Sequence, residues 1–178
     1  MAVLAEAISV IIKMQSIIHK FPGGWEEFTS YVPNKTLCAD GEIIRVGFMD
    51  SIDVEEYINF LETNGLIYID NNQARDIIVV DQIKGPLVDC HWIEFGTIDI
   101  GRDIMQKISA CRITGSKIKD IVLPENWQYD KSLSKEYLIT ETDDIDRRMV
   151  LLERKDGLRK YFDLKSGKTL YVGRTKED

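Results

Sequence analysis

The chain has 178 residues, of which 44% are apolar and 30% charged, and its net charge is −7. These proportions are ordinary for a globular protein and exclude a chain that is disordered throughout. A chain of this length can bury about 70% of the surface exposed by its unfolded form, so it needs no crosslinks to fold. We therefore expect one domain over 1–178, with a C-terminal β lobe from about 125–178 as the alternative.

Three sequence features predict a cytoplasmic protein that makes no use of a membrane. The opening segment 1–8 lacks a basic residue, and Glu6 interrupts its apolar run, which argues against a secretory signal. No apolar stretch approaches the roughly 20 residues that cross a bilayer. The three cysteines are odd in number and widely spaced, which favours reduced, buried thiols over disulfides.

The first third of the chain alternates between strand and helix patterns. Alternating β-branched residues predict a strand over 7–14, and a short helix is expected over 15–20. The Phe-Pro-Gly-Gly run at 21–24 breaks the chain. One or two helical turns over 25–31 and another alternating strand over 42–49 follow.

The clearest predicted helix begins at Asp50 or Ser51, either of which can cap its first turn. Glutamates occupy the polar side of this helix, including Glu55 and Glu62. Asn64-Gly65 predicts the end of the helix, because glycine readily adopts the left-handed backbone conformation that terminates helices. One apolar stripe at helical spacing is formed by Val54, Tyr57, Ile58 and Leu61.

The middle of the chain reads as strands. The runs 66–70 and 77–81, joined by Asn71-Asn72-Gln73, predict a hairpin. Two further strands are expected over 90–100 and 109–114, the first of them covered on both faces because both of its faces are largely apolar.

The segment 124–135 is expected to be irregular. The last thirty residues predict a three-stranded antiparallel meander over 149–153, 158–163 and 169–173, with Asp-Gly and Ser-Gly pairs at its turns. The fold class is therefore α+β, with a mainly antiparallel sheet, two or three helices and a C-terminal three-stranded meander.

No motif in the sequence defines a catalytic site. Cys90 and His91 could form a nucleophile and base, but neighbours on a strand point to opposite faces, so a structural role is favoured for His91. Glu94 and Arg112 lie on consecutive predicted strands, where an inward structural ion pair is favoured over a catalytic acid. Zinc-ligand spacings and phosphate-binding glycine loops are missing, so no metal and no cofactor are expected.

Charge is distributed unevenly along the chain. From 147 to 178 there are ten Lys and Arg against five Asp and Glu, a net of +5, so 1–146 carries −12. An acidic body disfavours nucleic acid as a partner, because phosphate contacts need clustered cations.

The densest acidic cluster could form a face for a basic partner protein, since clustered carboxylates speed association. A solvated linker is the favoured alternative. Two nearby aromatics are equally consistent with a binding hot spot and with loop anchors on the core. The candidate binding residues are Trp127, Tyr129, Glu141, Asp143, Asp144 and Asp146.

Three segments carry a family resemblance: FPGGWEEF at 21–28, TLCADGEIIRVGFM at 36–49, and VVDQIKGP with DCHWIEFG within 79–96. They resemble a family of uncharacterised small bacterial cytosolic proteins, and this resemblance implies no activity and no functional residue. In size and charge the chain is also similar to bacterial immunity proteins that neutralise toxins, although no motif is shared.

These observations favour a cytosolic protein-binding module, of the kind that inhibits a basic toxin or enzyme, over an enzyme. One alternative is an enzyme acting on a small molecule with a scattered pocket that uses Glu94, His91 or Cys38. Another is a homo-oligomeric structural subunit joined through an edge of the C-terminal meander, because exposed strand edges are natural pairing sites.

Overall fold

The computed structural model describes residues 2–99, 107–117, 120–139, 149–155, 158–164 and 166–173. Within these ranges the chain forms an α+β fold whose sheets are mostly antiparallel, as predicted. The described part contains four α-helices, one more than the upper expectation.

A five-stranded antiparallel sheet, the central sheet, lies at the middle of the molecule. Its strand β2 is buried on both faces, since every side chain from Ile8 to Ile12 is inaccessible to solvent. The order of its strands is β3 (Cys38–Ala39), β4 (Ile43–Phe48), β2 (Ile8–Lys13), β7 (Ile77–Asp81) and β8 (Gly85–Pro86).

A second, four-stranded sheet, the outer sheet, is mixed: β1 pairs with β10 in antiparallel and with β11 in parallel fashion. The order of its strands is β11 (Ile121–Val122), β1 (Ala2–Ala5), β10 (Lys107–Ile113) and β9 (Ile93–Asp99). Strand β1 runs almost directly into β2 and thereby joins the two sheets.

The crossing between the sheets is made by Glu6 and Ala7. Ala7 is buried and has a φ of 47°, a left-handed conformation that is uncommon for a residue other than glycine. The Ser9 hydroxyl stabilises the bend, because it accepts a hydrogen bond from the Glu6 N–H (2.9 Å) and donates one to the Glu6 carbonyl (2.8 Å).

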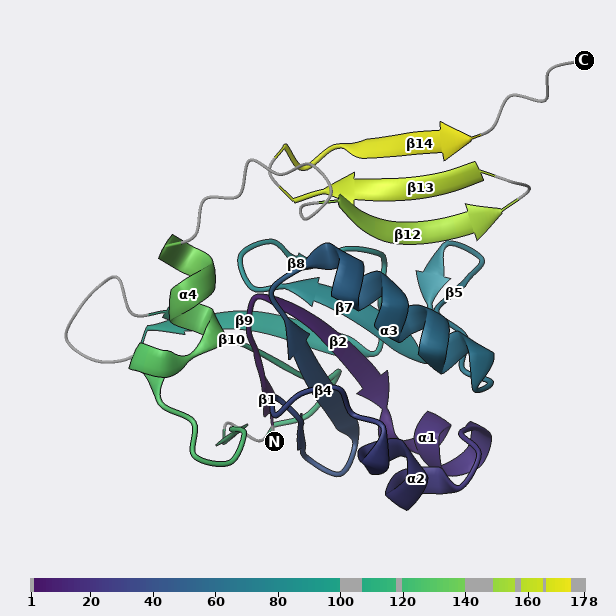
Figure 1. Cartoon of the computed structure of the whole chain (residues 1–178). Helices are drawn as coiled ribbons and strands as arrows, with labels where there is room; N and C mark the ends of the chain where they lie inside the picture. Colours follow the sequence, from purple (N-terminus) through teal and green to yellow (C-terminus); the bar gives the residue numbers. More distant parts are fainter. Residues whose placement is uncertain are drawn as a thin grey trace, which may run out of the picture.

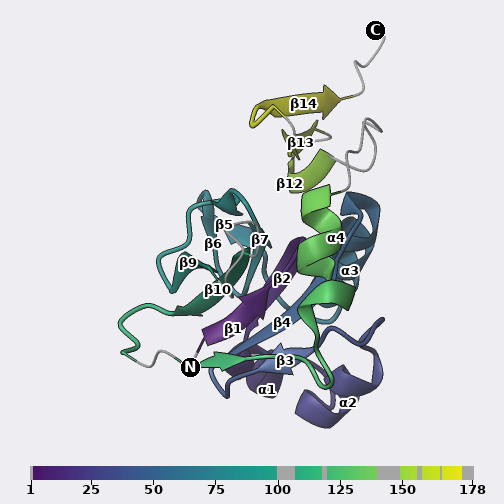
Figure 2. The ribbon, with the colours of Figure 1, turned by 90° about the vertical axis from the view of Figure 1, so that its left-hand side faces the viewer.

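The central sheet separates two hydrophobic cores. Ile8, Val10 and Ile12 share one face, as predicted, and pack against the helices α1 (Met14–Lys20), α2 (Gly24–Ser30) and α3 (Ser51–Thr63). The opposite face packs against the outer sheet and contributes Ile11, Ile43 and Ile78. The three layers are visible in the two ribbon views (Figures 1 and 2).

Helix α3 confirms the clearest prediction of the sequence, since its apolar stripe of Val54, Tyr57, Ile58 and Leu61 is buried. Asp50 occupies the N-cap position with extended backbone, but its side chain makes no capping hydrogen bond. None of the helices in the described ranges is both long enough and apolar enough to cross a lipid bilayer.

The predicted hairpin of 66–70 with 77–81 is wrong. Asn71 and Asn72, with φ of 52° and 63°, form a tight turn, but it joins β5 (Ile69–Asp70) to β6 (Gln73–Ala74). Strand β7 pairs with β2 and β8 instead, because its side chains are all buried and fit the middle of a sheet.

Strand β9 also differs from expectation. It begins at Ile93, so Cys90 and His91 precede it, and it is an edge strand of the outer sheet. From Gly96 to Ile98 it is exposed, and the prediction of cover on both faces is therefore wrong. An apolar pattern over a few residues does not distinguish an edge strand from a central one.

The segment expected to be irregular, 124–135, contains the 3₁₀ turn η1 (Tyr129–Lys131) and the start of α4 (Leu133–Ile139). Helix α4 is short, and tertiary contacts hold it. Gln82 Nε2 donates to the Ser134 carbonyl (3.1 Å), and the Tyr137 hydroxyl donates to the Asp81 carboxylate.

The C-terminal meander is confirmed as an antiparallel sheet of β12 (Met149–Lys155), β13 (Leu158–Asp163) and β14 (Thr169–Gly173). The predicted turn residues Asp156 and Gly157 lie outside the described residues. Both ribbon views place β12 beside α3 and β14 farthest from the central sheet (Figures 1 and 2). The meander is therefore attached to the rest of the protein mainly through β12.

Candidate functional site

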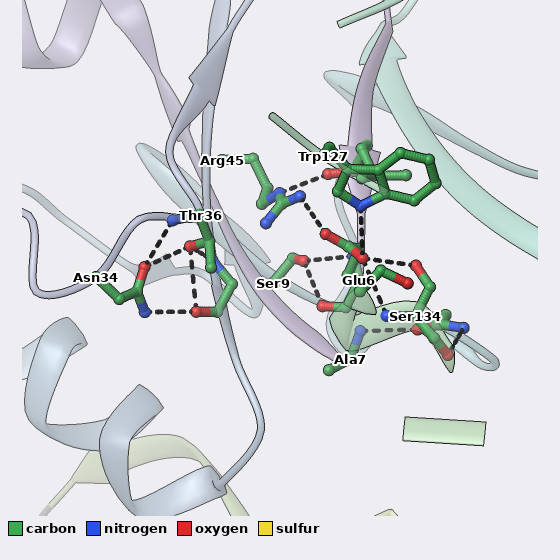
Figure 3. Close-up of polar contacts among 12 residues, drawn as sticks. Glu6, Ala7, Ser9, Asn34, Thr36, Arg45, Trp127 and Ser134 are labelled. Atoms are coloured by element: carbon green, nitrogen blue, oxygen red, sulfur yellow. Dashed lines mark hydrogen bonds and ion pairs between the residues drawn. The ribbon is translucent and has the colours of Figure 1, made fainter. Parts of the chain in front are cut away.

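A buried polar cluster lies where the chain crosses between the sheets, and we name it the Glu6 cluster: Glu6, Arg45, Trp127 and Ser134 (Figure 3). Only 2% of Glu6 is exposed. Its Oε1 accepts a hydrogen bond from Arg45 Nη2 (2.9 Å). Its Oε2 accepts from Ser134 N (2.9 Å), Ser134 Oγ (2.8 Å) and Trp127 Nε1 (3.1 Å).

The sequence around Arg45 makes room for its guanidinium. Arg45 Nε donates to the Leu4 carbonyl (2.6 Å), and a Cβ placed on Gly47 would lie 2.7 Å from Arg45 Nη1. A side chain at position 47 would therefore force the Arg45 guanidinium to shift. Asn34 Nδ2 donates to the Gly47 carbonyl (2.8 Å), and Gly47 N donates to Thr36 Oγ1 (2.7 Å), which fixes the adjoining loop (Figure 3).

The Glu6 cluster is closed to solvent, and its arrangement serves to hold the fold together. A single carboxylate receives donors from β4, from the loop at Trp127 and from α4, so it ties three distant segments to the bend before β2. Cys38 lies beside the cluster, and burial raises the pKa of its thiol although Arg45 opposes that rise. A buried, protonated thiol is a poor nucleophile.

The structure describes two of the six predicted binding residues. Trp127 is half-buried, anchored to Glu6 and in edge contact with Tyr129, with their ring centroids 6.4 Å apart. The hydrogen bond to Glu6 is what we expect if the aromatic residues anchor a loop on the core. A role of Trp127 and Tyr129 in binding stays a prediction. The other four, Glu141, Asp143, Asp144 and Asp146, lie outside the described residues.

The residues of the scattered-enzyme alternative differ in their exposure to solvent. Cys38 is buried on β3, whereas His91 is exposed before β9. Glu94 pairs with Arg112 across β9 and β10 (Oε2 to Nε, 2.7 Å), as predicted, but the side chains are 43% and 37% exposed instead of facing inward. The hydrogen bond from Arg112 holds the pKa of Glu94 below its usual value, which keeps that carboxylate ionised.

An open cavity of about 510 Å³ lies between α3 and β12, and we call it the α3–β12 groove. Its volume suits a small ligand or one large side chain. Helix α3 lines one wall, and β12 lines the other. The lining residues are Glu55, Ile58, Asn59, Glu62, Thr63, Tyr68, Ile69, Leu151, Leu152, Glu153 and Arg154.

Helical spacing explains the first wall. Glu55, Asn59 and Glu62 follow one another at i, i+4 and i+7, beside the apolar stripe that faces the core. On the second wall a register irregularity between Leu151 and Glu153 bends β12 where it passes α3. Polar side chains from two distant segments therefore surround one space.

The groove carries three carboxylates and one guanidinium. Arg154 Nη2 and Glu55 Oε1 form an ion pair across the groove (2.6 Å). Glu62 and Glu153 have no hydrogen bond or ion pair with any residue that the structure describes. Burial raises the pKa of Glu62, and the nearby charge of Arg154 partly opposes this rise. Acidic groups outnumber basic groups in the lining by three to one.

Tyr68 also lines the groove, and 5% of this residue is exposed. Burial raises the pKa of its hydroxyl, the charge of Glu62 adds to this rise, and a hydrogen bond with the Val79 backbone opposes it. Glu55 and Glu62 were expected on the polar side of their helix, but the groove was not predicted. The only available signal was a line of acidic residues beside an apolar stripe.

The chain matches no protein-family model, no curated protein and no solved structure. The class defined by these observations is an α+β protein with a closed polar anchor and an open anionic groove. Of these two features, the groove is the one that is open to a ligand.

Proposed function

We propose that the protein is a binding module for another protein that presents a basic surface, acting as an inhibitor of the immunity type. The α3–β12 groove carries this proposal, because Glu62 and Glu153 leave it with uncompensated negative charge. A basic toxin or enzyme would supply the missing cations.

The net charge of residues 1–146 also favours a basic partner protein. Residues 1–146 carry −12, so a basic protein is attracted before contact and its association is accelerated. The groove then offers a concave, partly apolar place at which a basic side chain can dock. A flat acidic surface would attract such a partner without positioning it.

Site-specific photo-crosslinking tests the proposal. A photoreactive residue replaces Thr63, which lines the groove, and in a matched protein it replaces Glu56, an exposed residue on α3 that does not line it. Both proteins are exposed to a lysate of the source cell at about 0.1 M and about 0.5 M salt, since screening shortens sharply over this range. We expect one basic protein to crosslink at Thr63, and less of it at high salt.

The same experiment can contradict the proposal. Equal crosslinking from positions 63 and 56, or crosslinking to acidic proteins, would show that the groove does not select a basic partner. Charge reversal with Glu62→Lys should abolish the specific product while the Glu56→Lys control retains it.

A second candidate is a homo-oligomer formed through the free edge of the C-terminal meander. Strand β14 ends the sheet order and pairs with β13 alone among the described strands. Leu170 and Tyr171 on it are 47% and 65% exposed. This candidate predicts a solution mass well above the 20.5 kDa of the chain, and a monomer at high concentration would contradict it.

A further inference from the structure

The charged side chains of the groove define the kind of ligand that it can hold. Three carboxylates and one guanidinium line it, and the lining also includes Tyr68, whose side chain is buried. A ligand that enters the groove therefore meets an excess of hydrogen-bond acceptors.

Acceptors for such a ligand come from both walls. Glu62 stands on α3 and Glu153 on β12, and neither carboxylate has a hydrogen bond or ion pair with another described residue. Asn59, three residues before Glu62, adds an amide carbonyl to the first wall. Several separated acceptors favour a ligand that has several donors pointing in fixed directions.

The apolar part of the lining specifies the rest of the ligand. Ile58, Ile69, Leu151 and Leu152 contribute hydrocarbon surface to the same cavity. A charged group on a chain of methylenes can place its stem on this surface and its head among the carboxylates. Compact inorganic cations would leave that surface unused.

An arginine side chain satisfies these requirements better than a lysine. Guanidinium presents five N–H donors in a rigid plane, whereas ammonium is a compact point charge. Arg154 already shows that a guanidinium is accepted here, since it pairs with Glu55 at 2.6 Å. The same pairing gives the guanidinium of Arg154 a counter-charge, so this cation is less available to an anionic ligand.

We propose that the α3–β12 groove binds the guanidinium of an arginine side chain from the partner protein. Glu62 and Glu153 provide the counter-charges. This inference rests on the proposed function and adds to it the side chain that is recognised.

Titration of the full chain with N-acetyl-arginine methylamide, followed by amide chemical shifts, tests the inference. A single side chain should bind with a dissociation constant of about 1–10 mM. The citrulline analogue has nearly the same shape but no charge, so it should bind at least about tenfold more weakly. The lysine analogue should fall between the two.

Three variants locate the binding. Glu62→Gln and Glu153→Gln should each weaken binding by about three- to fivefold, which is the range for partly exposed ion pairs. Glu56→Gln, on the same helix but outside the groove, should leave it unchanged. Thermal unfolding of each variant confirms that the fold is retained.

The outcomes separate this inference from the proposed function. Equal binding of the arginine and citrulline analogues, or binding unaffected by both Glu62→Gln and Glu153→Gln, would overturn it even if position 63 crosslinks a basic protein. Agmatine or spermidine binding about a hundredfold more tightly than the arginine analogue, without any crosslinked protein, would instead mark the groove as a small-molecule site and refute the partner side chain.

Discussion

Glu6 and Arg45 form an ion pair of 2.9 Å between Oε1 and Nη2 in which both side chains are buried. Charges removed from water are tolerated only when partners satisfy them. The Glu6 carboxylate also receives both donors of Ser134, so the position of α4 depends on the same group. The pair therefore couples the bend between the two sheets to a helix more than 120 residues later.

Glu6→Gln should destabilise the protein by about 3–5 kcal/mol, because it leaves the Arg45 charge buried without a counter-charge. Urea unfolding measures the change in the free energy of unfolding. The double variant Glu6→Gln/Arg45→Met should lose less stability than the sum of its single variants, since it removes both charges. Glu94→Gln, which breaks an exposed pair, is the control and should change stability little. Additive losses in the double variant would contradict the coupling.

Gly65→Ala should destabilise the protein by about 1–2 kcal/mol. Gly65 follows α3 with a φ of 97°, and an added Cβ would lie 3.3 Å from the Lys20 carbonyl. Gly96→Ala is the matched control, because a Cβ there meets nothing within 4 Å and its backbone is ordinary. Thermal unfolding compares the two. A loss as large at position 96 as at 65 would show that backbone strain is not the cause.

The elements that local sequence determines were predicted correctly. Helix α3 has its own apolar stripe and a glycine stop, and the C-terminal meander has short strands separated by turn residues. In both cases the pattern that selects the structure lies within about thirty residues. The pairing of Glu94 with Arg112 also followed from adjacent strands.

The elements that depend on distant contacts were not predicted. Helix α4 has seven residues and is held by Glu6, Gln82 and Asp81, which no local pattern relates to it. Ala7 adopts a positive φ that its residue type does not favour. The groove joins α3 to β12, about ninety residues apart, so its acceptors are visible in the sequence only as separate polar positions.

Asp76→Asn should destabilise the protein by about 1–3 kcal/mol at neutral pH. Asp76 accepts hydrogen bonds from Ser16 Oγ (2.7 Å), Lys20 Nζ (2.8 Å) and Ile67 N (2.7 Å). Burial raises the pKa of Asp76, but these hydrogen bonds outweigh it and hold the pKa below the usual value. The folded state therefore favours the ionised carboxylate.

The pH dependence of this difference has a definite sign. Below about pH 4 the unfolded chain takes up a proton on Asp76 before the folded protein does, so acid favours unfolding. The contribution of Asp76 is fully present above that pH and is lost as pH falls through the lowered folded pKa. Urea unfolding at pH 7, 4 and 3 should show the wild type and Asp76→Asn converging in acid. Parallel curves would contradict this role.

Arg154→Gln should strengthen binding of the arginine analogue at pH 8 by about two- to fivefold, because it removes the one cation of the groove and leaves Glu55 unpaired.

Arg154→Gln should also raise the pH at which the affinity for the arginine analogue is lost on acidification, compared with the wild type. Burial raises the pKa of Glu62 and Arg154 opposes this, so without Arg154 the pKa rises further. As pH falls through that value, Glu62 is protonated and attracts guanidinium less. Titrations at pH 8, 6 and 5 measure both effects, and weaker binding by the variant at pH 8 would mean that Arg154 holds an anionic ligand and that the groove does not select cations.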